Sequence, residues 1–165
     1  MPYKSYRFFD SYELRVSWIS NGASKSAKKD VVWDEKRTKV ISAKLRGRIY
    51  ASGGTNARLS FNDSEVIFCG APVVDSTVED TVDVTGILIN GSNICLAEVW
   101  KIFYYPFDKI GRFTAELIVE YEGESPEMKA PWEKYLMPAL GVASLGVSVA
   151  GLAVSLKKEK KEGGK

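Results

Sequence analysis

The chain contains no histidine among its 165 residues. Histidine is the commonest general acid and base near neutral pH and the commonest protein ligand of transition metals. Its absence argues against an enzyme, and we predict no catalytic site, no metal site and no cofactor. Glycoside hydrolysis needs only a carboxylate pair, but with 21 Asp and Glu residues no particular pair stands out.

The chain also has a small net charge and few cysteines. Lys and Arg total 23 against those 21 acids, and a net charge of +2 gives no reason to expect nucleic acid as a partner. The two cysteines, Cys69 and Cys95, are too far apart for a Cys-x-x-Cys motif. They form either a disulfide or two buried thiols, and the apolar surroundings of Cys95 favour buried thiols.

One long stretch, residues 135–156, carries no charge over 22 residues. A helix of this length crosses a hydrocarbon core about 30 Å thick. Trp132 and Tyr135 stand at one border as interfacial aromatics, and lysines follow the other border. We therefore predict a transmembrane helix over 135–156, preceded by a juxtamembrane linker over 129–134 and followed by a basic tail over 157–165.

Small residues recur along one stripe of this predicted helix, where they let two helix backbones approach closely in lipid. The stripe predicts association with another copy or with another membrane protein, although small residues are common in any transmembrane segment. Its members are Ala139, Ala143, Gly146, Ala150 and Ala153.

Two signals conflict on which side of the membrane the rest of the chain lies. Five lysines follow the span and few precede it closely, which predicts a tail inside and a domain outside. The N-terminus lacks the apolar run of a cleavable signal peptide, which predicts a domain left in the cytosol. We follow the lysine count and expect an external domain.

Residues 1–128 are expected to form one all-β domain, because apolar and polar side chains alternate with the period of half-buried strands. This alternation covers residues 12–18, 43–49, 57–61 and 113–121, with Lys44, Arg46 and Arg48 facing outward. Turn signals separate the strands at residues 52–54, 62–63, 70–72 and 90–91, and the Asn-Gly pair at 90–91 favours a hairpin. Many short strands without alternating helices predict an antiparallel β-sandwich of the jelly-roll type.

Several other side chains suggest binding sites. The basic stretch over residues 25–39 is interpreted as a solvated loop. Three aromatics, Trp33, Tyr104 and Tyr105, are candidates for stacking on sugar rings, with core or lipid-facing packing as the alternative. The acids Asp75, Glu79 and Asp80 are candidate Ca²⁺ ligands, although scattered loop acids are usually solvated.

Two segments, residues 57–66 and 82–93, together resemble the galactose-binding-like jelly roll of the sugar-binding domains in family 2 glycosidases. The resemblance lies in a strand that ends in an Asn turn, a later Asp-Val-Thr, and a Gly-x-Asn before the next strand. It implies a jelly roll without implying sugar. From the residues themselves, Asp83 or Thr85 is expected to satisfy turn amides and Ile87 and Leu88 to plug one end of the sandwich.

Fold and anchor together predict a membrane-anchored structural or assembly protein, such as an envelope, virion or membrane-complex subunit, that uses its jelly roll for protein contacts. The alternative is a membrane-bound carbohydrate- or ligand-binding module. The expected partners are membrane lipid and a second copy or another membrane protein, with carbohydrate under the alternative.

Overall fold

The computed structural model describes residues 1–17, 23–34, 37–103 and 106–130. Met1–Lys129 form one compact unit, and the elements of its described residues are strands apart from a single short 3₁₀ turn. The elements are β1 (Tyr3–Val16), β2 (Ser24–Asp34), β3 (Thr38–Ala51), β4 (Thr55–Phe61), β5 (Ser64–Ala71), β6 (Ser76–Asp83), η1 (Thr85–Ile87), β7 (Gly91–Lys101), β8 (Lys109–Gly123) and β9 (Glu127–Lys129).

The expected transmembrane segment, 135–156, and the stripe of small residues within it lie outside the described residues. Within the described ranges, no helix has the length and apolar character needed to span a membrane.

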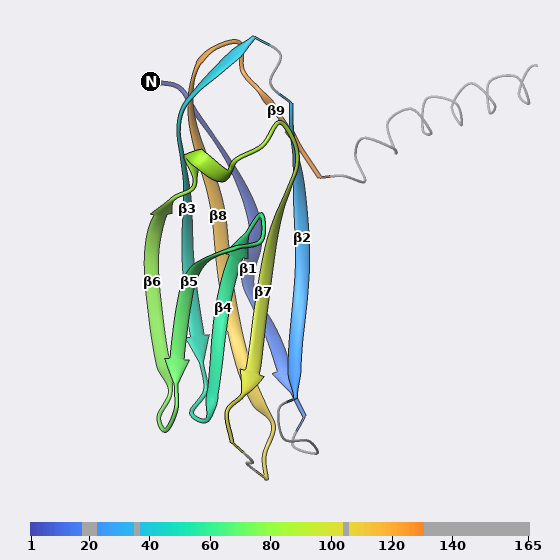
Figure 1. The fold of residues 1–165 in the computed structure, drawn as a ribbon, viewed down its shortest axis with the longest axis vertical. Coiled ribbons are helices and arrows are strands. Elements are labelled where there is room, and N and C mark those ends of the chain that lie inside the picture. Colours follow the sequence, from blue (N-terminus) through green and yellow to red (C-terminus); the bar gives the residue numbers. More distant parts are fainter. Residues whose placement is uncertain (18–22, 35–36, 104–105, 131–165) are drawn as a thin grey trace, which may run out of the picture. The chain divides into compact units, whose positions relative to one another are not determined.

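The strands form two antiparallel sheets that face each other (Figure 1). One sheet has the order β1-β8-β3-β6 and the other the order β5-β4-β7-β2-β9. The pairings are nested: β1 pairs with β8, β2 with β7, β3 with β6, and β4 with β5. A long hairpin that is closed by the β4–β5 turn and then rolled up gives this order, which is the arrangement of a jelly roll. The sandwich predicted from the sequence is confirmed.

Alternation along the strands builds the core between the sheets. In β3, Leu45, Gly47 and Ile49 face inward and are buried, whereas Arg46 and Arg48 face solvent. A Cβ on Gly47 would meet side-chain atoms of β5 and β4 at 2.6 and 2.8 Å, so the absence of a side chain there lets the second sheet pack closely. The outward basic residues are where the alternation predicted them.

Strand β1 breaks the alternation. Its register against β8 shifts between Arg7 and Phe9 and again between Phe9 and Tyr12. A bulge adds a residue to one strand only, so consecutive residues can face the same side. Phe8 and Phe9 are accordingly both buried, and Ser11 adopts a left-handed backbone with φ of 50°.

The basic stretch over residues 25–39 is not a loop, and that prediction is wrong. Most of it is β2, which pairs with β7 along its whole length, and its end begins β3. Its charged side chains are tolerated because β2 lies near the edge of its sheet, with only the short β9 beyond it. Lysines on such strands are typical, since they discourage pairing with other chains.

The expected hairpin at residues 90–91 is also wrong. β6 and β7, the strands on either side, belong to different sheets, and η1 carries the chain from one sheet to the other. Gly91, with φ of +119°, is the first residue of β7.

Cys69 and Cys95 are two buried free thiols, as the apolar surroundings favoured. Cys69 lies opposite Ala57, and Cys95 lies opposite Phe61, on the other side of β4. The cysteines are separated by two strand spacings, roughly 9–10 Å, across β4 and by four residues, roughly 13 Å, along it. This is far beyond the Cα separation of about 7 Å that a disulfide spans. Burial raises the pKa of the Cys95 thiol to about 12.

Candidate functional site

The motif residues that carry the family resemblance close one end of the sandwich. The side-chain nitrogen of Asn62, Nδ2, donates to the Ile87 carbonyl at 2.6 Å and to Asn93 Oδ1 at 2.8 Å. Asn62 Oδ1 accepts the Ile94 amide at 2.8 Å. Asn93, fully buried, accepts the Ile89 amide at 2.9 Å and donates back to the Ile89 carbonyl at 2.7 Å. These two asparagines are occupied with backbone groups and hold the β4–β5 turn against the start of β7.

The Asp-Val-Thr segment is occupied in the same way. Thr85 Oγ1 accepts the Ala43 amide at 2.8 Å, and Asp83 Oδ1 accepts the Thr85 amide at 2.8 Å. The bond from the Thr85 amide holds the pKa of Asp83 below its ordinary value. Ile87 and Leu88 pack against the core. The structural roles predicted for these residues are confirmed.

Of the three predicted stacking aromatics, Trp33 lies among the described residues. Trp33 is only 1% exposed and belongs to the core, because its position on β2 faces inward. A ring buried there cannot stack on an external sugar. For Trp33 the stacking role is therefore wrong, and the alternative, packing in the core, is confirmed. Tyr104 and Tyr105 lie outside the described residues.

The candidate Ca²⁺ ligands do not converge. Asp75 accepts hydrogen bonds from Tyr50 and Gly53, and Glu79 forms an ion pair with Arg46. In the described part of the chain, His, Cys, Asp and Glu side chains form no group of three or more that is placed to hold a metal ion.

Residues 100–107 form a run rich in aromatic side chains. The described part of this aromatic run divides between a sheet face and a loop. Trp100 lies on the outer face of the five-stranded sheet, with its ring 6.2 Å from that of Phe68. The Arg58 guanidinium stands 5.5 Å from the Trp100 ring centroid and is bonded to Glu98 at 2.6 Å. One face of the indole is therefore covered by a side chain that is already paired.

The loops at one end of the sandwich expose large apolar side chains. Val73 and Val74, in the β5–β6 loop, are 76% and 73% exposed. Phe103 and Phe107, in the β7–β8 loop, are 56% and 69% exposed. Both loops lie at the lower end in Figure 1, on either side of the β3–β4 turn. We call these four residues the apolar loop end.

The β3–β4 turn ties the two loops together. A Cβ on Gly53 would lie 2.3 Å from the Val73 carbonyl oxygen, so only glycine allows this approach. The Gly54 carbonyl accepts the Ile102 amide at 3.0 Å, which joins the turn to the β7–β8 loop. The apolar loop end thus rests on a bonded scaffold.

Asp75 completes this scaffold. Its carboxylate accepts the Tyr50 hydroxyl at 2.5 Å and the Gly53 amide at 2.8 Å. The bond from Tyr50, followed by that from Gly53, holds the pKa of Asp75 below its ordinary value, and the bond to Asp75 raises the pKa of Tyr50. A charged Asp75 therefore stabilises the conformation of the β5–β6 loop.

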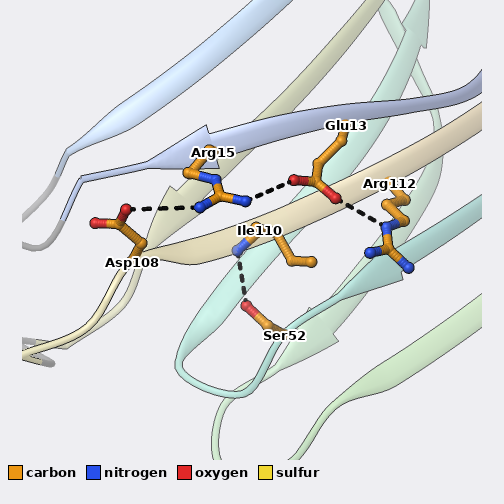
Figure 2. Close-up of polar contacts among 6 residues, drawn as sticks. All are labelled: Glu13, Arg15, Ser52, Asp108, Ile110 and Arg112. Atoms are coloured by element: carbon orange, nitrogen blue, oxygen red, sulfur yellow. Dashed lines mark hydrogen bonds and ion pairs between the residues drawn. The ribbon is translucent and has the colours of Figure 1, made fainter.

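The outer face of the β1-β8-β3-β6 sheet carries a chain of ion pairs (Figure 2). Arg15 lies between Asp108, at 4.0 Å, and Glu13, at 3.1 Å, and Glu13 also accepts Arg112 Nε at 3.0 Å. These bonds, the one from Arg112 first, hold the pKa of Glu13 below its ordinary value. Exposed pairs of this kind contribute little to stability, so the importance of the chain lies in fixing the guanidinium groups.

Beside this chain the same face is hollowed in two places. One depression, of about 300 Å³, is lined by Arg7, Asp10, Arg46, Gly47, Arg48, Glu79, Thr114 and Glu116. The other, of about 250 Å³, is lined by Ser11, Arg48, Tyr50, Thr77, Arg112 and Thr114. The alternating pattern predicted that Arg46 and Arg48 face solvent. It did not predict the hollows, because the β1 bulges beside them leave no recognisable signal in the sequence.

No family model matches the chain, so membership of the galactose-binding-like family stays a prediction. No curated protein matches it either.

Among solved structures, the chain is similar to that of the infectious bursal disease virus Gx strain, with a TM-score of 0.44 and 12% identity over 76% of this chain and 33% of that one. It is also similar to the VP2 subviral particle of infectious bursal disease virus, with a TM-score of 0.38 and 14% identity over 72% of this chain and 32% of that one. This chain thus spans about a third of the viral chains.

A third similar structure is a family 35 carbohydrate binding module from an environmental isolate. Its TM-score is 0.34, with 15% identity over 76% of this chain and 98% of that one. Likenesses of this size carry no argument about function, and the jelly-roll assignment rests on the nested strand order.

Proposed function

We propose that this chain is a non-catalytic assembly subunit, a jelly-roll domain tethered to a membrane by residues 135–156, which contacts further copies of itself through the apolar loop end. The observation that carries the proposal is the exposure of Val73, Val74, Phe103 and Phe107 at one end of the domain. Large apolar side chains gathered on the surface of a soluble domain are typical of protein interaction sites.

The position of this end within the domain supports the proposal. The last strand, β9, pairs with residues 32–34 of β2, at the end of the sandwich opposite to the β7–β8 loop (Figure 1). β9 therefore lies at one end of the domain and the apolar loop end at the other. β9 leaves the apolar loop end uncovered, and in the proposed assembly this end contacts a neighbouring copy.

Two charged strands at or beside a sheet edge offer less favourable contacts. β6, at one edge, carries Glu79, Asp80 and Asp83, and β2 carries exposed lysines beside the short β9. Charged edge strands discourage the addition of further strands. The loops are therefore better suited to assembly than these two strands.

Cross-linking through an introduced cysteine tests this contact. Both native cysteines are buried, so Val74→Cys in the full chain adds an accessible thiol near the expected contact. Ile89→Cys is the matched control, because Ile89 is also apolar and 52% exposed but lies in the β6–β7 connection at the opposite end. With a short bis-maleimide, we expect a cross-linked dimer from Val74→Cys and little from Ile89→Cys. Equal yields, or none from either, would refute the proposed interface.

The tether is tested separately. We expect the full chain to stay in the membrane pellet after alkaline carbonate extraction of cells that express it. Protease added to intact cells should digest the domain if it is external, as the lysine count predicts. Release by carbonate would contradict the tether, and protection of the domain from protease would contradict the orientation.

A further inference from the structure

The smaller of the two depressions on the charged sheet face differs from its neighbour in chemistry. Its lining contains two guanidinium groups, from Arg48 and Arg112, four hydroxyl groups and no carboxylate. The larger depression balances three arginines against three acids. We call the smaller one the hydroxyl depression, and its lining alone has an excess of positive charge.

Arg48 has no ion-pair partner among the described residues. The carboxylate opposite it in the register belongs to Glu79, but Glu79 pairs with Arg46 at 3.3 Å. On its other side Arg48 faces Thr114, which is neutral. The exposed Arg48 guanidinium therefore lines the hydroxyl depression without an ion pair to any described residue.

Arg112 is held in place while some of its donors stay available. Its Nε donates to Glu13 at 3.0 Å, and its guanidinium lies 5.8 Å from the Tyr50 ring centroid. No described residue is bonded to its two terminal nitrogens. Arg112 is a diagonal neighbour of Arg48 across β3 and β8, which places their Cα atoms roughly 7–8 Å apart. Long side chains at this separation reach a common ligand.

The hydroxyl groups complete the lining. Thr114 Oγ1 accepts the Ser11 amide at 3.3 Å, which leaves the Thr114 hydroxyl hydrogen available to a ligand. Ser11 reaches this position because the β1 bulge gives it a φ of 50°. Thr77 contributes a hydroxyl from β6, and Tyr50, whose hydrogen is donated to Asp75, contributes an acceptor.

We propose that the hydroxyl depression binds a ligand bearing an oxyanion, that is, a carboxylate, sulfate or phosphate group. The oxyanion lies between Arg48 and Arg112, since planar guanidinium groups match such oxygens with paired hydrogen bonds. The hydroxyl groups bind further polar atoms of the ligand. A volume of about 250 Å³ is close to the lower end of the range for small-molecule sites. This site shares Tyr50 with the scaffold of the apolar loop end but includes none of its four exposed apolar residues, so it does not depend on the assembly role.

The test is a titration of the full chain in lipid nanodiscs, followed through the Nε–Hε signals of its arginines by NMR. The probes are inorganic sulfate, inorganic phosphate and glucuronate, with glucose as the neutral comparison. We expect saturable shifts of the Arg48 and Arg112 signals with at least one anion, and none with glucose. The order of the three affinities shows whether the site prefers a tetrahedral oxyanion, as in sulfate and phosphate, or the carboxylate of a sugar acid.

Arg48→Gln should weaken this binding by roughly 10- to 100-fold, the usual effect of losing hydrogen bonds to a charged group. Lys44→Gln is the matched control, because Lys44 is exposed on the same face of β3 and lines neither depression. It removes the same charge and should change affinity little. Thr77→Val removes the Thr77 hydroxyl but keeps the side-chain shape, and it should also weaken binding of the preferred anion.

The proposal is overturned if no anion gives saturable shifts at its highest soluble concentration. It is also overturned if Arg48→Gln and Lys44→Gln weaken binding equally, because a general surface potential then explains the attraction. Equal binding of glucose and glucuronate would likewise exclude an oxyanion site.

Discussion

Replacing Asn93 by alanine removes four hydrogen bonds from one end of the sandwich. The buried amide accepts the Ile89 amide and Asn62 Nδ2, and it donates to the carbonyls of Ile89 and Gly91 at 2.7 and 3.2 Å. A hydrogen bond of this kind contributes about 1 kcal/mol net. We therefore expect Asn93→Ala to lower the free energy of unfolding by about 4 kcal/mol.

For a domain of this size, about 4 kcal/mol corresponds to a fall in Tm of roughly 10–16 °C. Thermal unfolding of the full chain, followed by circular dichroism in the strand region, measures it. Thr81→Ala is a suitable control, because Thr81 is exposed on β6 and its hydroxyl forms no hydrogen bond with the described residues. A loss below about 1 kcal/mol for Asn93→Ala, no larger than one ordinary hydrogen bond, would refute the structural interpretation of the Gly-x-Asn motif.

Three further predictions concern buried or bonded groups. Trp33→Ala should lower the free energy of unfolding by about 3–5 kcal/mol. Trp33→Phe should lower it much less, because the buried indole N–H has no hydrogen-bond partner in the described structure and its loss breaks no bond. Urea unfolding of both variants measures the difference. The pKa of Asp75 is lowered in the folded state, so its contribution to stability is present above its unfolded pKa of about 3.9 and is lost as the pH falls through the lower folded value. Between neutral pH and about pH 3, the Tm of Asp75→Asn should therefore fall less than the Tm of the wild type. Cys69 and Cys95 should both resist a thiol reagent in the native chain and react after unfolding, because both are buried; fast native reaction would contradict their placement.

The strands that the sequence predicted are those with one face in the core. Residues 113–121 fall within β8, and residues 57–61 fall within β4. β2 was missed because its lysines hide the alternation, and a strand near a sheet edge tolerates them. The order of the strands could not be derived from alternation, which assigns a face to each residue but no partner to a strand.

The candidate surfaces were predicted only in part. Period-2 alternation placed Arg46 and Arg48 on the outside, but it does not predict which of them forms an ion pair. The register sets Glu79 opposite Arg48, whereas the Glu79 side chain pairs diagonally with Arg46. The exposure of Phe107 depends on a loop, where no periodicity applies. Lys101 shows the same limit within the aromatic run: it is only 3% exposed, and its Nζ donates to the Ser17 carbonyl at 2.6 Å.

The central claim, assembly through the apolar loop end, is tested most directly by sedimentation equilibrium of the full chain in density-matched detergent. The wild type is predicted to self-associate, the double variant Val74→Ser/Phe107→Ser to shift toward the monomer, and Ile89→Ser, at the opposite end, to associate like the wild type. A double variant that associates as strongly as the wild type, with its fold intact by circular dichroism, would contradict the account.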